Sequence, residues 1–335
     1  MNEMTVVYFK GLERGYSVSG VLAEFNLSGN PVTIRWYGII VAAAFLLALL
    51  FGGRMALKWR MNPDKLTDVL IYGTLGGTVG ARLYYLITHW AEYQENFGAA
   101  FRIWEGGLSL YGGLIGAALA VVLVCRIRKL NLLNLLDIAG MSLLLGQGLG
   151  SWGGYTNQDA FGSNTKLPWG MISEKTTAYL YANQSQFIGK GLEVDPFSYV
   201  HPTFLYQFFW CLLGFFVLYL ITKNFRKFSG QTALCFGIWY SLGSMFFSNL
   251  RAESLYLGPV RVSLLVSFLL AAACAALLLF RLQECQKNPK PIEGIDFFPG
   301  APSSPKEEEA PAAEEAPDTA TADEGTPDTE ETETK

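Results

Sequence analysis

The sequence predicts an all-α, polytopic membrane protein with seven transmembrane helices, and three observations support this class. Of the 335 residues, 51% are hydrophobic and only 16% are charged, whereas about 25% of the residues of a soluble domain are charged. Apolar stretches of the length that crosses a bilayer recur along the chain. Basic residues gather in alternate loops between these stretches, as they do in oriented membrane proteins.

The seven apolar stretches follow one another without a long interruption except after the fourth. They cover residues 37–57, 67–88, 107–126, 133–151, 203–222, 231–248 and 262–280. Some contain several glycines, as in GTLGGTVGAR and GGLIGA. Glycines inside membrane helices let two backbones approach closely, so packing is the simplest explanation for them.

The loops between the spans orient the chain. Loops 53–66, 126–132 and 223–230 are basic, whereas loop 89–105 on the opposite side carries Glu92, Glu95 and Glu105. Because cytoplasmic loops carry the excess of Lys and Arg, we expect the N-terminus outside and the C-terminus in the cytoplasm.

This orientation divides the chain into three parts. Residues 1–30 form an extracytoplasmic N-terminal segment, and residues 31–285 form the membrane domain with an external cap loop over 152–202. Residues 286–335 form an acidic cytoplasmic tail, in which 301–335 hold twelve acidic residues against two lysines. A segment rich in Ala, Pro, Thr and Glu cannot bury enough apolar surface to fold, so we expect the tail to be disordered.

The polar residues of the spans gather toward the outer side. Each of five segments contributes some of them: Arg82, Tyr111, Gln147, Ser151, Asn157, Asp159, His201, Tyr206, Gln207, Ser244, Ser248 and Arg251. Ser244, Ser248 and Arg251 lie at i, i+4 and i+7 on one helix face. Snorkelling side chains would populate both leaflets, so this bias predicts a polar cavity open to the outer leaflet.

Each of these residues also has a structural explanation. Arg82 can snorkel to outer headgroups, His201 can lie at a helix start, and serines such as Ser244 commonly pack helices together. Asp137, near the inner end of the fourth span, is expected to be a structural partner or a helix-start residue. The five cysteines lack the spacing of a disulfide framework or a zinc site.

Several motifs resemble one family, the bacterial prolipoprotein diacylglyceryl transferases. The similarity runs in the family's order from residue 34 to residue 263. It is carried by IRWYGIIVAAAF, GTVGARLYYLI, WEGGLSLYGGLIGA, GQGLGSWGGYTNQDAFG, HPTFLYQ and LRAESLYLGPVRVS.

The resemblance implies a transfer reaction in the bacterial plasma membrane. A diacylglyceryl group moves from phosphatidylglycerol to the lipobox cysteine thiol in the signal peptide region of a preprolipoprotein, and glycerol phosphate is released. The partners are these two substrates and membrane lipid; no cofactor, metal or nucleic acid is expected.

The resemblance also implies residue roles. Tyr111 or His201 assists deprotonation of the thiol, while Arg82 and Arg251 contact the phospholipid headgroup. Further substrate-binding positions are Tyr37, Ser151, Asn157, Asp159 and Ser244.

The chain departs from the family pattern at charged positions. Ser151 and Ser244 stand for arginines, Ser248 stands for a glutamate, and Gly154 stands for an asparagine. Cation and anion are thus replaced jointly, which leaves a neutral site. An alternative is therefore a non-catalytic paralogue that binds phospholipid or lipoprotein signal peptides. A small transporter is the third hypothesis, but no inverted repeat supports it.

Overall fold

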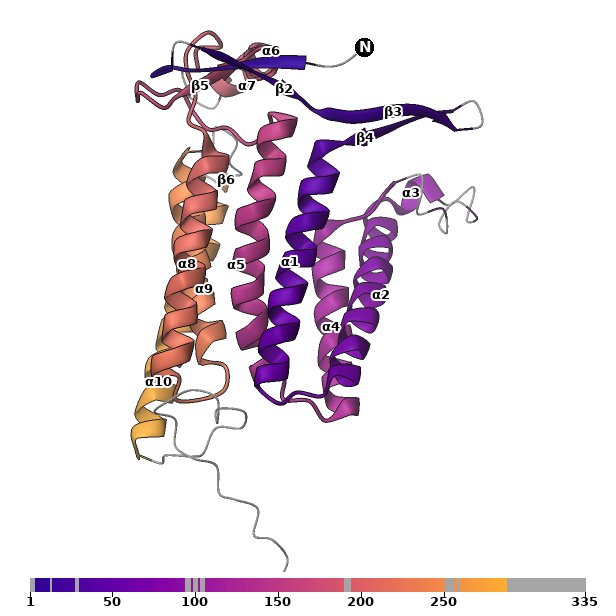
Figure 1. Ribbon diagram of the computed structural model, residues 1–335, viewed down its shortest axis with the longest axis vertical. Helices are drawn as coiled ribbons and strands as arrows, with labels where there is room; N and C mark the ends of the chain where they lie inside the picture. Colours follow the sequence, from indigo (N-terminus) through magenta and orange to yellow (C-terminus); the bar gives the residue numbers. More distant parts are fainter. Residues whose placement is uncertain are drawn as a thin grey trace, which may run out of the picture. The chain divides into compact units, whose positions relative to one another are not determined.

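The computed structural model describes residues 4–12, 14–27, 30–93, 98, 102, 106–189, 194–250, 256–257 and 260–287. Within them, long helices occupy all seven ranges that the sequence predicts (Figure 1). These are α1 (Trp36–Lys58), α2 (Pro63–Thr88), α4 (Leu110–Arg128), α5 (Leu132–Asn157), α8 (Thr203–Phe225), α9 (Gln231–Leu250) and α10 (Val262–Lys287). Five of them, namely α1, α4, α5, α8 and α10, are long and apolar enough to cross a membrane. The chain is therefore a multi-pass membrane protein.

Local sequence signals set several helix ends. The side chains of Asn62 and Asn131 accept backbone N–H groups at the starts of α2 and α5, which satisfies donors that have no partner inside the helix. Lys129 and Gln158 end α4 and α5 in the left-handed conformation, as residues after a helix often do. Helix α5 thus continues to Asn157, six residues beyond its predicted end, and the cap begins later than residue 152.

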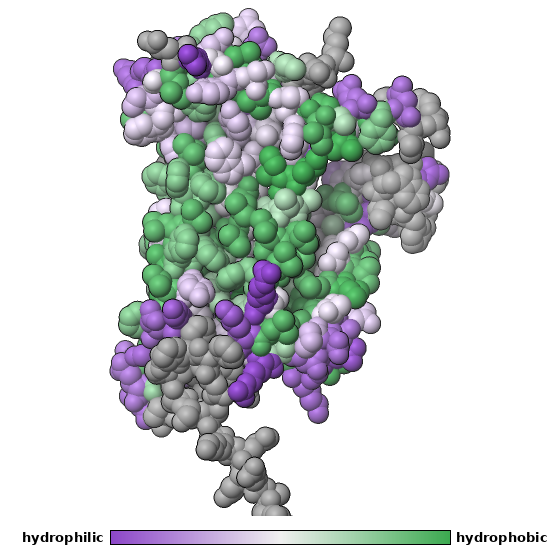
Figure 2. Space-filling view, viewed as in Figure 1, coloured by the Kyte–Doolittle hydropathy of each residue, from purple (hydrophilic) through white to green (hydrophobic). Residues whose placement is uncertain are grey.

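Helix α5 lies at the centre of the packing. It contacts α1, α8 and α9, and α9 in turn packs on α10. Helices α2 and α4 form a separate pair beside α1 (Figure 1). The surface of the long helices is apolar in a broad band between polar ends (Figure 2), and side chains such as Leu119 and Phe280 are 67% and 63% exposed. Lipid is the environment in which such a surface is stable.

Glycines bring α2 and α4 into backbone contact. A Cβ atom on Gly80 would lie 2.5 Å from the Gly112 carbonyl oxygen, and one on Gly116 would lie 2.3 Å from the Gly76 carbonyl oxygen. No larger residue fits at these crossings without separating the helices. The packing role that the sequence predicts for these glycines is confirmed.

The chain also contains strands, so the all-α prediction was incomplete. Strands β1 (Met4–Phe9), β2 (Gly15–Ser19) and β5 (Met171–Ser173) form a sheet in the order β2-β1-β5. Two further hairpins are β3 (Val21–Leu27) with β4 (Asn30–Arg35), and β6 (Tyr256–Leu257) with β7 (Val260–Arg261). The short helices are α3 (Trp90–Tyr93), α6 (Glu174–Ala182) and α7 (Gln184–Gly189).

The N-terminal segment and the cap loop share one hydrophobic core. Val7 of β1 is fully buried beside Met171, Leu180 and Phe187 of the cap. The pairing of Val7 with Ser173 joins residues far apart in the chain, which no local pattern reveals. The predicted boundary at residue 30 also falls at the turn of the β3–β4 hairpin. The acidic tail beyond Lys287 lies outside the described residues.

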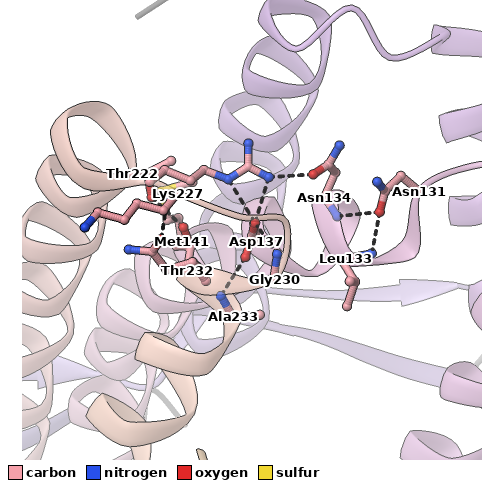
Figure 3. Close-up of polar contacts among 12 residues, drawn as sticks. Asn131, Leu133, Asn134, Asp137, Met141, Thr222, Lys227, Gly230, Thr232 and Ala233 are labelled. Atoms are coloured by element: carbon pink, nitrogen blue, oxygen red, sulfur yellow. Dashed lines mark hydrogen bonds and ion pairs between the residues drawn. The ribbon is translucent and has the colours of Figure 1, made fainter. Parts of the chain in front are cut away.

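A buried ion pair joins α5 to the loop before α9 at the end away from the cap (Figure 3). The Arg226 guanidinium donates through Nε and Nη2 to Asp137 Oδ2 at 3.1 and 2.9 Å. The backbone N–H groups of Gly230 and Ala233 donate to the same carboxylate at 2.8 Å each. Arg226 also lies over the Trp59 ring, 3.9 Å from its centroid. Asp137 is therefore the structural partner that the sequence predicts.

Candidate functional site

A polar cavity of about 120 Å³ lies among α5, α8 and α9, in the halves of these helices nearest the cap. Its polar and aromatic lining comes from all three helices: Gln147 of α5, Gln207 and Trp210 of α8, and Tyr240, Ser244 and Ser248 of α9. Apolar side chains such as Leu144 and Phe247 complete the wall. We call this space the polar cavity.

Several polar groups of the polar cavity have no partner among the described residues. The side-chain amides of Gln147 and Gln207 make no hydrogen bond to another described residue. The Trp210 indole N–H is buried and has no acceptor in the part of the chain that the structure describes. No charged side chain of the described residues lines the space. An uncharged group with hydroxyl or carbonyl oxygens matches this set of groups.

Two serines of α9 connect the cavity to α10. The Ser267 hydroxyl donates to Ser244 at 3.1 Å, and the Ser248 hydroxyl donates to Ser263 at 3.0 Å. Both α9 serines face the same neighbour, as their i, i+4 spacing predicts. Each therefore serves helix packing and cavity lining together.

Ser151 and Tyr37 stabilise the cap end of α5. The Ser151 hydroxyl reaches the carbonyl oxygens of Gly148 at 2.7 Å and Phe204 at 3.1 Å, so it links α5 to α8. The Tyr37 ring covers Gly153, where an added Cβ would lie 3.1 Å from a ring carbon. Neither residue lines the polar cavity among the described residues.

The chain turns sharply after α5. A Cβ atom on Gly154 would lie 2.6 Å from the Ala160 Cβ, so the returning chain requires glycine there. The Asn157 side-chain amide donates to the Asp159 carboxylate at 2.7 Å. These two predicted residues thus pair with each other at the surface of the turn.

The glycine-rich stretch then meets the start of α8 and the end of α9. Gly162 donates its N–H to the His201 carbonyl oxygen at 2.9 Å, and His201 donates its N–H to the Ser163 oxygen at 3.0 Å. Ser163 in turn donates to the Leu250 carbonyl oxygen at 2.7 Å. The glycine-rich stretch and His201 are thus joined through their backbones.

His201 is part of a chain of hydrogen bonds. Its Nδ1 lies 3.1 Å from the Tyr206 hydroxyl oxygen, which accepts the Trp169 indole N–H at 2.7 Å. Burial lowers the pKa of the His201 imidazole below its ordinary value, because desolvation disfavours the charged form. The ring is therefore neutral at pH 7 and able to accept a proton.

Arg82 and Tyr111 belong to the α2–α4 pair and not to the polar cavity. The Arg82 guanidinium is buried and donates through Nη1 to the carbonyl oxygens of Gly106 at 2.7 Å and Gly107 at 3.0 Å. Both glycines have positive φ angles. Arg82 thus holds the turn before α4, whereas Tyr111 on the first turn of α4 is 66% exposed. Arg251 lies outside the described residues.

The sequence reasoning missed the aromatic members of the site. Trp210 follows Gln207 by three residues, a spacing that places both on one helix face, so a signal was present. Trp169 of the cap donates its indole N–H to the Tyr206 hydroxyl. No local sequence pattern predicts this hydrogen bond, because the two residues are far apart in the chain. Tyr240 precedes Ser244 by four residues on α9, and that spacing also predicts a shared face.

Comparison with known proteins gives consistent matches. A family model described as prolipoprotein diacylglyceryl transferase matches residues 24–280. Two Staphylococcus aureus proteins, each called phosphatidylglycerol–prolipoprotein diacylglyceryl transferase, are 37% identical to this chain over 258 residues, or 77% of it. The matched region spans 88% of the protein from strain bovine RF122/ET3-1 and 87% of that from strain MRSA252.

Proposed function

The chain belongs to the prolipoprotein diacylglyceryl transferase family, and from this premise we propose how its residues act. It is a transferase that moves a diacylglyceryl group from phosphatidylglycerol to prolipoproteins. The relatives described above are transferases, which favours this activity over a non-catalytic lipid-binding paralogue. The further proposals concern the membrane topology and the catalytic groups.

We propose that all seven long helices cross the bacterial plasma membrane, with the cap outside and the tail in the cytoplasm. The basic residues support this orientation, because Lys58, Arg128 and Lys223 lie in the last turns of α1, α4 and α8. These three helix ends are joined to the next helices by the basic loops. The lipobox cysteine of a signal peptide then reaches the enzyme at the outer leaflet, on the cap side.

His201 is the proposed general base. The cysteine thiol gives its proton to His201 Nε2, and the thiolate sulfur attacks the glyceryl carbon of phosphatidylglycerol. A C–S bond forms, the C–O bond to the phosphate breaks, and glycerol phosphate leaves with the electron pair. This role requires the tautomer in which Nδ1–H donates to the Tyr206 oxygen, so that Nε2 is unprotonated.

The observation that carries this assignment is the bond chain from Trp169 through Tyr206 to His201. It fixes the orientation of the imidazole just before the start of α8, the helix that also supplies Gln207 and Trp210 to the polar cavity. Arg82 has a positioning role through the turn before α4. Arg251 remains the proposed partner of the phosphate, and the exposed Tyr111 is the second proposed group near the thiol.

A variant of His201 tests the base. The purified full-length protein in lipid nanodiscs is given labelled phosphatidylglycerol and a lipobox peptide, and thioether-linked diacylglycerol is measured. His201→Gln is expected to lower kcat by about 10²–10⁴-fold, the usual contribution of a general base. His89→Gln is the matched control, because His89 is the second of the two histidines and stacks on Tyr85 at the end of α2.

The pH profile gives a second readout. The base works only when neutral, so the rate falls as the pH drops through the pKa of His201. Burial lowers this pKa, so the fall lies below the ordinary histidine value of about 6.5. A profile for His201→Gln that keeps the same acidic limb would assign the base to another group. Absence of product from the wild type, beside an active relative, would revive the non-catalytic alternative.

A further inference from the structure

The outer face of the sheet β2-β1-β5 forms one wall of a groove of about 590 Å³. Side chains alternate across a strand, so Val6 and Tyr8 of β1 lie on the face opposite to the buried Val7. Ile172 of β5, which pairs with Tyr8, extends this face. Helix α6 and Phe197 complete the lining. We call this space the cap groove.

The cap groove is apolar and open to the outside. Three of its aromatic side chains, Tyr8, Tyr181 and Phe197, are 49%, 67% and 72% exposed. The solvent-facing side of an antiparallel sheet is ordinarily polar, so a concave apolar surface with exposed rings indicates a binding surface. Tyrosine rings suit such a surface, because they offer a large contact area at a small cost in side-chain entropy.

The charge and place of the cap groove narrow the class of partner. Glu174 is part of the lining, and its carboxylate has no hydrogen bond or ion pair to a described residue. A carboxylate repels the phosphates of anionic lipids, and β5 and α6 lie in the cap beyond the ends of α5 and α8 (Figure 1). An extended polypeptide fits better, because it offers apolar side chains to the rings and a lysine or arginine to Glu174.

The cap groove adjoins the proposed general base. Met171 and Val200 exchange backbone hydrogen bonds of 2.9 and 2.8 Å. Ile172 follows Met171, and His201 follows Val200. Consecutive Cα atoms are 3.8 Å apart and paired ones about 5.5 Å, so the Cα atoms of Ile172 and His201 are at most about 13 Å apart. About four residues of extended chain span that distance.

We propose that the cap groove binds the extended segment of the prolipoprotein that follows the lipobox cysteine. The inference rests on the proposed function, because His201 sets where the cysteine lies. The signal peptide occupies the membrane, so the chain after the cysteine leaves on the cap side and reaches the groove within a few residues. An apolar side chain of this segment packs against Ile172 and Tyr181, and a basic one pairs with Glu174.

The cap groove also gives this chain a means of substrate selection of its own. Strand β1 precedes residue 24, where the match to the family model begins. One wall of the groove therefore lies outside the matched region. Preference among prolipoproteins is thus set partly by the residues after the cysteine and partly by β1.

The test compares two lipobox peptides that differ in length. The short peptide ends directly after the cysteine, and the long one continues for about ten extended residues that include a leucine and a lysine. Serine replaces the cysteine, and binding to the full-length protein in nanodiscs is measured by fluorescence anisotropy. We expect the long peptide to bind at least about tenfold more tightly, as burial of one large apolar side chain allows.

Variants of the groove locate this preference. Tyr181→Ala and Glu174→Lys should each reduce the ratio of the two affinities at least about threefold. Tyr16→Ala and Glu24→Lys make the same changes at exposed positions of β2 and β3 that do not line the groove, and they should retain the ratio.

Three results would overturn the proposal. The first is equal binding of the two peptides by the wild type, and the second is a wild-type ratio in both groove variants. The third is a change of oligomeric state in Tyr181→Ala, seen by native mass spectrometry, with wild-type peptide binding. That result would assign the groove to a second copy of the chain.

The transfer assay with the cysteine-containing peptides keeps the groove and the enzyme apart. A wild type that modifies both lengths with the same kcat/KM would overturn the groove and leave the transferase intact. A wild type that binds the long peptide through Tyr181 and Glu174 but transfers no diacylglyceryl group would overturn the catalytic assignment and leave the groove intact.

Discussion

Helices α5, α8 and α9 enclose two polar clusters, one toward each end of the bundle, and the two clusters differ in how far their groups are satisfied. In the inner cluster, at the end away from the cap, Asp137 accepts from Arg226, Gly230 and Ala233 and is fully buried. At the cap end, the amides of Gln147 and Gln207 have no partner among the described residues. The Asp137 carboxylate is satisfied by groups of the protein, whereas the two amides are left open toward the cavity.

The contrast also concerns charge. The inner cluster is an ion pair, and a charge buried in a protein must be paired. The cap-end cluster is neutral, so its amides can stay open at a smaller cost. Ser244 and Ser248 fit such a neutral lining, because their hydroxyls hydrogen-bond to serines of α10.

The largest expected effect comes from breaking the inner cluster. Asp137→Ala leaves the Arg226 guanidinium buried without its anion, so we expect a loss of about 3–5 kcal/mol of stability. The loss appears as a lower thermal unfolding midpoint in detergent. Asp68→Asn is the control, because Asp68 pairs with Arg128 at 2.7 Å on an exposed surface, where such pairs contribute about 0–1 kcal/mol. Equal losses from the two variants would contradict a structural role for Asp137.

An intermediate effect is expected at the turn after α5. Gly154→Asn introduces the residue that the resemblance implies at this position, but its Cβ would lie 2.6 Å from the Ala160 Cβ. We expect a destabilisation of about 1–3 kcal/mol, as for other overpacked positions, with faster amide hydrogen exchange over residues 157–163. Gly150→Ala is the matched control, since its nearest neighbour lies 4.0 Å away. A stable Gly154→Asn protein would show that the turn can move aside.

The smallest effect on stability is expected in the polar cavity, where a substitution can stabilise the protein instead of destabilising it. Gln207→Leu removes an amide that has no partner among the described residues, so the free energy of unfolding should stay within about 1 kcal/mol of the wild type or rise. The measurement is thermal unfolding in lipid-free detergent. A loss comparable with that of Asp137→Ala would show that the cap-end cluster is structural like the inner one.

Much of the helical architecture was predictable, and the cap was not. The apolar runs are long enough to mark all seven helices, and α8 and α9 begin at the predicted residues, 203 and 231. The strands escaped prediction because β1 finds its partner β5 more than 160 residues away. Their stability comes from the shared core around Val7 and Met171, which short polar-apolar segments do not reveal on their own.

In the candidate site, too, some residue positions were predictable from the sequence and others were not. Ser244 and Gln207 were expected at the cap ends of their helices, and both line the polar cavity. Arg82 was expected to contact a lipid headgroup, yet it binds the carbonyl oxygens of Gly106 and Gly107. Ser151 likewise bonds to the Phe204 carbonyl oxygen. Depth along a helix follows from sequence position, but the neighbour that a side chain meets does not.

By itself, the sequence determined the helix ranges, the basic loops, the outer bias of the polar residues and the resemblance to one family. These are properties of composition and spacing, which act over one or two helical turns. Only the tertiary structure decided which polar groups are satisfied. Asp137 meets Arg226 across 89 positions, and Gln147 meets no partner among the described residues. Hydrogen bonds between helices depend on how whole helices pack against one another.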